Sequence, residues 1–137
     1  MSERAFESEI DGVLADEIVS AVRTSVGDTL RGVVYFTPAA FDVLYVRQGL
    51  YSTREATRRA ASRLVEFEER GFDEEAGRAD RDDVAIGDYE FTVRVHGEGF
   101  VVRILVGERG VLFTSDEIEI GAFDDAASAV RGLLADA

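Results

Sequence analysis

The sequence predicts an α+β fold in which three helices flank a five-stranded antiparallel sheet, in the order α-β-β-α-β-β-β-α. Three segments have apolar residues at helical spacing, and five short β-branched or aromatic runs are joined mostly by tight turns. The length of 137 residues suits one core. We therefore expect a single domain over residues 1–137, with an exposed acidic connection at 73–88.

The first predicted helix covers residues 9–26. Ser8 is its expected N-cap, and Gly27 is its expected C-terminal stop. One apolar stripe runs along it: Ile10, Val13, Leu14, Ile18, Ala21, Val22 and Val26.

A β-hairpin follows. Residues 30–36 (LRGVVYF) and 41–47 (FDVLYVR) are strand-like, and residues 37–40, which include the single proline, form the turn. Both strands carry apolar residues at odd and even positions. This pattern indicates a sheet covered on two faces.

Ser52 and Glu55 have the spacing of a capping box, which predicts a second helix that runs to Arg70 and stops at Gly71. Its expected inward stripe is Ala56, Ala60, Leu64 and Phe67. Arginine and glutamate alternate on the expected outer face, which suits a solvent-exposed surface.

The connection at 73–88 is rich in acidic residues and lacks periodicity, although Val84 and Ile86 are candidates for core contacts. Three strands follow at 89–96, 100–106 and 111–115. The first alternates apolar and polar residues, as a half-exposed edge strand does. The second is apolar except for Arg103 and is expected to lie inside the sheet. A last helix is predicted from Asp124 to Ala135, with Asp124 and Asp125 at its start.

This order of elements resembles the roadblock and profilin-like arrangement. That resemblance implies the strand order 2-1-5-4-3 and places the third strand at an edge. The segments GDTLRGVVYF, DVLYVRQGLY and YEFTVRVHGEGFVVRI resemble a group of small uncharacterised proteins of halophilic archaea, and the similarity spans residues 26–134. It transfers no functional residues.

The charge balance also indicates a protein from a halophilic organism. The chain has 28 acidic and 15 basic residues, the basic residues are all arginine, and the net charge is −13. Such a surface suits high salt, because molar salt shortens the Debye length to about 3 Å and screens carboxylate repulsion. The acidity argues against nucleic acid as a partner. Without a long apolar run or a signal-like start, we expect a cytoplasmic protein, not a membrane one.

The sequence offers little catalytic chemistry. Cysteine and lysine are absent, and His96 is the one histidine, which we interpret as an exposed residue ending an edge strand. No phosphate-binding loop or calcium-loop pattern is present. Carboxylate pairs such as Glu117 with Glu119 are expected by chance in so acidic a chain. We therefore predict a non-enzymatic protein without a cofactor or a metal site, with a carboxylate-only enzyme as the third-ranked alternative.

Two hypotheses of function rank above the enzyme. The first is a protein-interaction or signalling module that pairs with itself as a homodimer or with another protein. Its candidate surface lies on the second helix and the third strand: Arg58, Arg59, Arg63 and Arg94.

The second hypothesis is a sensor domain for an anionic metabolite. Its candidate ligand-binding residues are Arg47, Tyr51 and Arg103. Arg47 and Tyr51 flank the start of the second helix, and Arg103 interrupts an apolar strand. If Arg103 is buried it requires a partner, and Arg94 and Arg103 are placed to face a carboxylate across the sheet.

Overall fold

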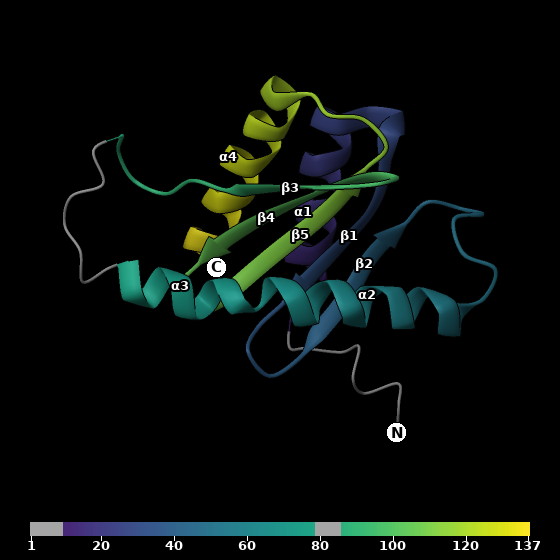
Figure 1. The fold of residues 1–137 in the computed structure, drawn as a ribbon, viewed down its shortest axis with the longest axis horizontal. Coiled ribbons are helices and arrows are strands. Elements are labelled where there is room, and N and C mark those ends of the chain that lie inside the picture. The colour runs from purple at the N-terminus through teal and green to yellow at the C-terminus, as the bar shows by residue number, and fades with distance from the viewer. Residues whose placement is uncertain (1–9, 79–85) are drawn as a thin grey trace.

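The computed structural model describes residues 10–78 and 86–137. Its elements are α1 (Gly12–Val26), a 3-10 turn (Gly27–Thr29), β1 (Leu30–Phe36), β2 (Phe41–Val46), α2 (Arg54–Glu68), α3 (Arg70–Arg78), β3 (Thr92–His96), β4 (Gly99–Val106), β5 (Arg109–Ser115) and α4 (Ile120–Asp136). The strands form one antiparallel five-stranded sheet in the order β2-β1-β5-β4-β3 (Figure 1). The predicted fold class is confirmed, and the strand order is the one that the resemblance implied.

The sheet is covered on both faces, as the apolar pattern of its strands predicted. Helices α1 and α4 lie on one face, where the rings of Phe113 and Phe123 meet edge-on with centroids 5.6 Å apart. Helix α2 lies across the other face, where Ala61 and Val65 pack with Phe36 and other strand residues (Figure 1). Among the described residues, no helix is long and apolar enough to cross a membrane.

The N-caps differ from those predicted. Asp11 caps α1, because its Oδ2 accepts hydrogen bonds from the backbone N–H groups of Val13 and Leu14 at 3.0 and 3.2 Å. The helix thus begins later than residue 9, and Ser8 lies outside the described residues. At α2 the cap is Thr53, whose Oγ1 accepts from the N–H of Ala56 at 3.0 Å.

Helix α2 is also rotated relative to the prediction. Its buried residues are Ala61, Val65 and Glu68, whereas Phe67, expected to face inward, is 40% exposed. The stripe is shifted by one position, because Glu68 forms ion pairs with the buried Arg103 and the half-buried Arg94, which the apolar side chain of Phe67 could not form.

The chain also remains helical through Gly71, where a stop was predicted, and α2 and α3 are separated only by Glu69. Gly71 faces the sheet. A Cβ atom at this residue would overlap the Arg103 guanidinium and lie 2.8 Å from Cδ1 of Leu105. Glycine is needed here for close approach to the sheet and not for ending a helix.

The acidic connection is shorter than 73–88, because α3 takes up its first part. Residues 79–85, including Val84, lie outside the described residues, and Ile86 is exposed, so its predicted core contact is wrong. The edge strand β3 is confirmed but begins at Thr92, and α4 begins four residues before the predicted Asp124.

Candidate functional site

A buried carboxylate connects α2 to the sheet. Glu68, the last residue of α2, is 1% exposed, and Arg103 of β4 is 3% exposed. Nη1 of Arg103 donates to Oε1 of Glu68 at 3.3 Å. Because an unpaired buried charge is strongly destabilising, each side chain depends on the other. The carboxylate that Arg103 requires therefore comes from the helix packed on the sheet.

Glu68 also binds Arg94 of the edge strand. Arg94 donates from Nε to Oε2 at 2.8 Å and from Nη2 to Oε1 at 3.1 Å, a two-bond geometry that is among the strongest available to arginine. These bonds raise the pKa of Arg94 above its usual value. The Arg94 guanidinium also lies 4.4 Å from the ring centroid of Phe67. Glu68 thus ties together α2, β3 and β4.

The other nitrogen of the Arg103 fork is engaged as well. Nη2 donates to Oγ1 of Thr92 at 2.9 Å and to the Tyr89 hydroxyl at 3.4 Å, and it lies 3.6 Å from a carboxylate oxygen of Glu74. A ligand at Arg103 would have to displace these partners inside the core. These contacts give Arg103 a structural role between α2 and the sheet, and its ligand-binding role stays a prediction.

Arg47 is committed in a similar way near the surface. It binds Asp116 with two bonds, Nη1–Oδ2 at 2.7 Å and Nη2–Oδ1 at 3.2 Å, and Arg31 adds a third to Oδ1 at 3.1 Å. The hydrogen bond from Arg47 is the main reason that the pKa of Asp116 lies below its ordinary value. This trio joins the end of β2, β1 and the loop after β5. The structure therefore gives Arg47 a structural carboxylate partner too.

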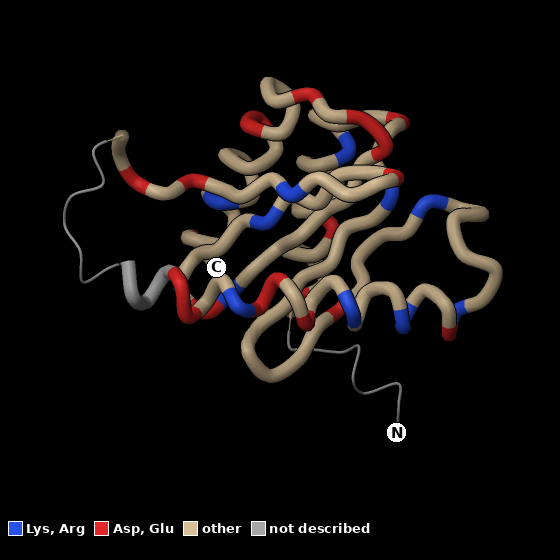
Figure 2. Tube along the Cα trace, in the orientation of Figure 1, with Lys and Arg blue, Asp and Glu red and all other residues tan. Residues whose placement is uncertain are grey.

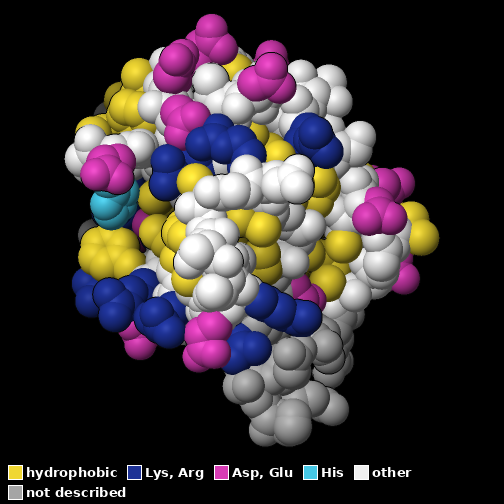
Figure 3. All heavy atoms as spheres, turned by 90° about the vertical axis from the view of Figure 1, so that its right-hand side faces the viewer, with side chains coloured by type: hydrophobic (Ala, Val, Ile, Leu, Met, Phe, Trp, Pro, Cys, Tyr) yellow, Lys and Arg dark blue, Asp and Glu magenta, His cyan; other side chains and the backbone are white. Residues whose placement is uncertain are grey.

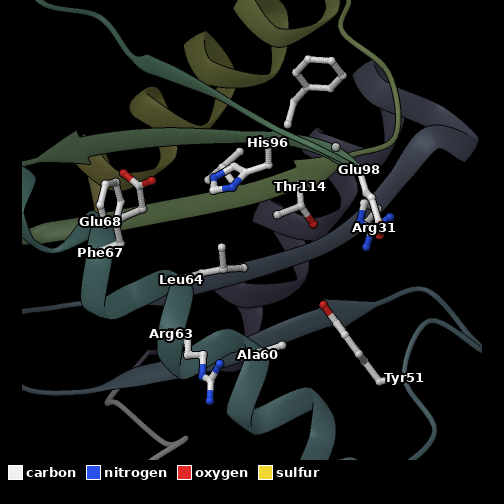
Figure 4. A pocket seen from close by; sticks show the side chains of 13 residues that line it. Arg31, Tyr51, Ala60, Arg63, Leu64, Phe67, Glu68, His96, Glu98 and Thr114 are labelled. Atoms are coloured by element: carbon white, nitrogen blue, oxygen red, sulfur yellow. The ribbon is translucent and has the colours of Figure 1, made fainter.

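Tyr51, the third ligand candidate, lines a cleft of about 410 Å³. The cleft lies between α2 and the strand ends near the β3–β4 turn (Figure 4). Figure 4 shows Ala60, Arg63 and Leu64 extending from α2, with His96 and Thr114 across the cavity from them. Arg47 and Arg103 are not among the lining residues. Tyr51 thus lines a cleft to which the two arginines grouped with it do not contribute.

Of the four candidate interaction residues, two are exposed and two are half-buried. Arg59 and Arg63 are exposed one turn apart on α2, and Arg59 lies 3.9 Å from Glu55. Arg58 is half-buried on the same helix, whereas Arg94 is held by Glu68. Arginines gather along the N-terminal half of α2, and acidic residues gather from its C-terminal end into α3 (Figure 2).

Within residues 10–78 and 86–137, no group of three or more His, Asp or Glu side chains is placed to hold a metal ion. His96 is exposed and ends β3, as its position beside a turn suggested.

A protein-family model matches most of the chain. The family described as "Domain of unknown function (DUF7522)" matches residues 16–135. The chain belongs to this family. The match covers every strand of the DUF7522 domain and all of α2, α3 and most of α4. No curated protein matches the chain.

Two residues central to these sites in this DUF7522 domain were missed from the sequence. Glu68 was hidden because its neighbour Phe67 is the more natural core residue. Ala61, Val65 and Glu68 nevertheless recur at helical spacing, and a charged residue in such a stripe is the signal that could have identified it. The second missed residue is Arg31. It is the one charged residue in the strand LRGVVYF, as Arg103 is in β4, and that position is the signal that could have identified it.

Proposed function

We propose that this protein is a non-enzymatic, cytoplasmic interaction or signalling module of a halophilic archaeon, of roadblock-like architecture, which pairs with a second copy of itself through β3 and α2. The observation that carries the proposal is the position of β3. It is an edge strand, and no described strand pairs with its outer side.

The surroundings of this edge suit a partner. Val95 on β3 is 69% exposed, and Phe67 on the neighbouring part of α2 is 40% exposed. The strand is held firmly, since Arg94 on it binds the buried Glu68. An unpaired edge that is rigid and flanked by apolar side chains can extend its sheet by pairing with another strand.

The charges along α2 favour a second copy as that partner. Arg59 and Arg63 precede Glu66 along α2, and Glu69 follows the helix as its C-cap residue (Figure 2). Two such helices related by a two-fold axis perpendicular to them run antiparallel, so the arginine-bearing part of one faces the glutamate end of the other. Antiparallel pairing of two β3 strands requires the same axis.

The salt-adapted origin is supported by composition. The net charge is −13, and arginine supplies all 15 basic residues. In molar salt, long-range repulsion between two acidic copies is screened while apolar contacts are strengthened or unchanged. We therefore expect self-association to be favoured at high salt.

Sedimentation equilibrium in molar KCl tests the proposal. The wild-type chain is expected to have the mass of a dimer. Val95→Lys, which places a charge on the sheet edge, should shift it to monomers. The matched control is Val13→Lys, because Val13 is 67% exposed on α1, far from β3 along the fold, and the substitution makes the same charge change.

A wild-type protein that stays monomeric at the highest soluble concentration would contradict the proposal. So would a Val95→Lys variant that remains as dimeric as Val13→Lys, because the contact would then lie elsewhere.

A further inference from the structure

The cleft beside α2 has the size of a small-molecule site. Its volume of about 410 Å³ falls within the range of roughly 300–1,000 Å³ that is typical of ligand pockets. It lies between α2 and the ends of β1, β4 and β5, next to the β3–β4 turn (Figure 4).

The walls of this cleft are largely apolar. Leu64 and Phe67 of α2 form one side with Ala60, and Phe100 and Val101 of β4 form the other. Phe67 is held in place by the Arg94 guanidinium over its ring. Such walls select a ligand with an apolar body.

The rim carries positive charge that the protein leaves uncompensated. Arg63 lines the cleft and has no ion-pair partner among the described residues. Arg31 also lines it, and Arg31 shares the single carboxylate of Asp116 with Arg47, which leaves one excess positive charge in that trio.

The acidic lining residues offset only part of this charge. Glu68 is neutralised by Arg94 and Arg103, and Glu98 lies exposed on the β3–β4 turn. An electropositive cleft on a chain of net charge −13 stands out against its surroundings. Figure 3 shows arginine side chains above and below a hydrophobic area, with acidic side chains gathered toward the top of the view.

We infer that this cleft binds an anionic amphipathic small molecule, such as an organic acid with an apolar tail or ring. Its acid group lies at the rim formed by Arg31 and Arg63, and its apolar body lies against Leu64 and Phe67. The hydroxyl groups of Tyr51 and Thr114, together with His96, supply further polar contacts around the opening. The cleft shares Arg63 and Phe67 with the proposed contact between copies, but binding of a ligand requires only one chain.

A matched pair of dyes tests this inference. 8-Anilinonaphthalene-1-sulfonate combines an aromatic body with an anionic group, and N-phenyl-1-naphthylamine has the same aromatic body without the charge. Both fluoresce more strongly in apolar surroundings. In molar KCl we expect saturable binding of the sulfonate dye at one site per chain, with the neutral dye at least tenfold weaker, as the loss of a charge-assisted contact implies.

Variants locate the site. Arg63→Gln is expected to weaken binding of the sulfonate dye roughly tenfold without affecting the neutral dye. Arg59→Gln is the control, because Arg59 lies one turn away on the same helix and does not line the cleft. Ala60→Leu fills the cavity and should abolish binding of both dyes. Val95 does not line the cleft, so Val95→Lys should not weaken dye binding even where it abolishes the dimer, and the two proposals can fail separately.

Several results would overturn the inference. Equal affinities of the wild-type and Arg63→Gln proteins for the sulfonate dye would show that the charge of Arg63 does not contribute to binding. Equal affinities of the two dyes would show a purely apolar site. Amide chemical-shift changes in nuclear magnetic resonance spectra that centre away from Leu64, Gly99 and Thr114 would place the dye elsewhere.

Discussion

Glu68 and Arg103 form an ion pair between α2 and β4 with both side chains almost completely removed from solvent, and Arg94 reaches the same carboxylate from the edge strand. The pair holds the helix on the sheet at the point where α2 passes into α3. Because both side chains are buried, water cannot replace either one if the other is removed.

Glu68→Ala should lower the free energy of unfolding by about 3–5 kcal/mol, because Arg103 would remain charged and buried without its main partner. Urea denaturation followed by circular dichroism in molar KCl measures the change. Glu55→Ala is the control, since it breaks the exposed pair with Arg59 and should cost at most about 0.5 kcal/mol. Similar losses in the two variants would show that burial of the pair is unimportant.

Gly71→Ala should destabilise the protein by about 1–3 kcal/mol although alanine favours helices, because the new methyl group would overlap Arg103. Gly132→Ala in α4 is the matched control. A Cβ atom there meets nothing within 4 Å, so alanine should stabilise the helix by about 0.5–1 kcal/mol. Thermal unfolding of both variants checks the opposite signs. A stabilised Gly71→Ala protein would contradict the close approach of helix and sheet.

Asp116 should contribute stability that depends on pH. Its folded pKa is lowered, chiefly by the hydrogen bond from Arg47, so its contribution is complete above the unfolded pKa of about 3.9 and is lost as the pH falls through the lower folded value. Because the side chain is 37% exposed, Asp116→Asn should cost no more than about 1 kcal/mol at neutral pH.

Urea denaturation of wild type and Asp116→Asn across the acidic range measures this dependence. The difference between the two proteins should shrink as the pH falls below about 4. A difference that stays constant from neutral to strongly acidic pH would mean that the carboxylate charge has no part in it.

The net charge of −13 should make stability rise with salt. The Tm is expected to increase from dilute buffer into molar KCl, because screening relieves carboxylate repulsion in the compact state. Replacing Asp80, Asp82 and Asp83 with asparagine in the full chain removes three negative charges and should flatten this dependence. A Tm that falls with KCl, or an unchanged slope in the triple variant, would count against repulsion as the cause.

The candidate site shows where sequence reasoning reached its limit. Burial of a charge in an apolar strand predicted that Arg103 needs a partner, and that partner exists. The sequence did not identify Glu68 as that partner, because Phe67 and Glu68 are adjacent on α2 and hydrophobicity alone favours turning Phe67 inward. Likewise, Gly71 resembles a helix stop in sequence, whereas in space it is the contact that lets the helix approach Arg103.

The sequence by itself determined the acidic character, the α+β class, the order of the elements and the edge position of β3, because composition, hydrophobic period and turn residues are local properties. Tertiary structure alone decided the rotation of α2, the pairing of Arg47 with Asp116, and the cleft lined by Arg31, Tyr51 and Arg63. These depend on which faces meet when distant segments pack. A difference of one residue in helical phase changes which side chain is buried, and only the partner across the interface selects between the two.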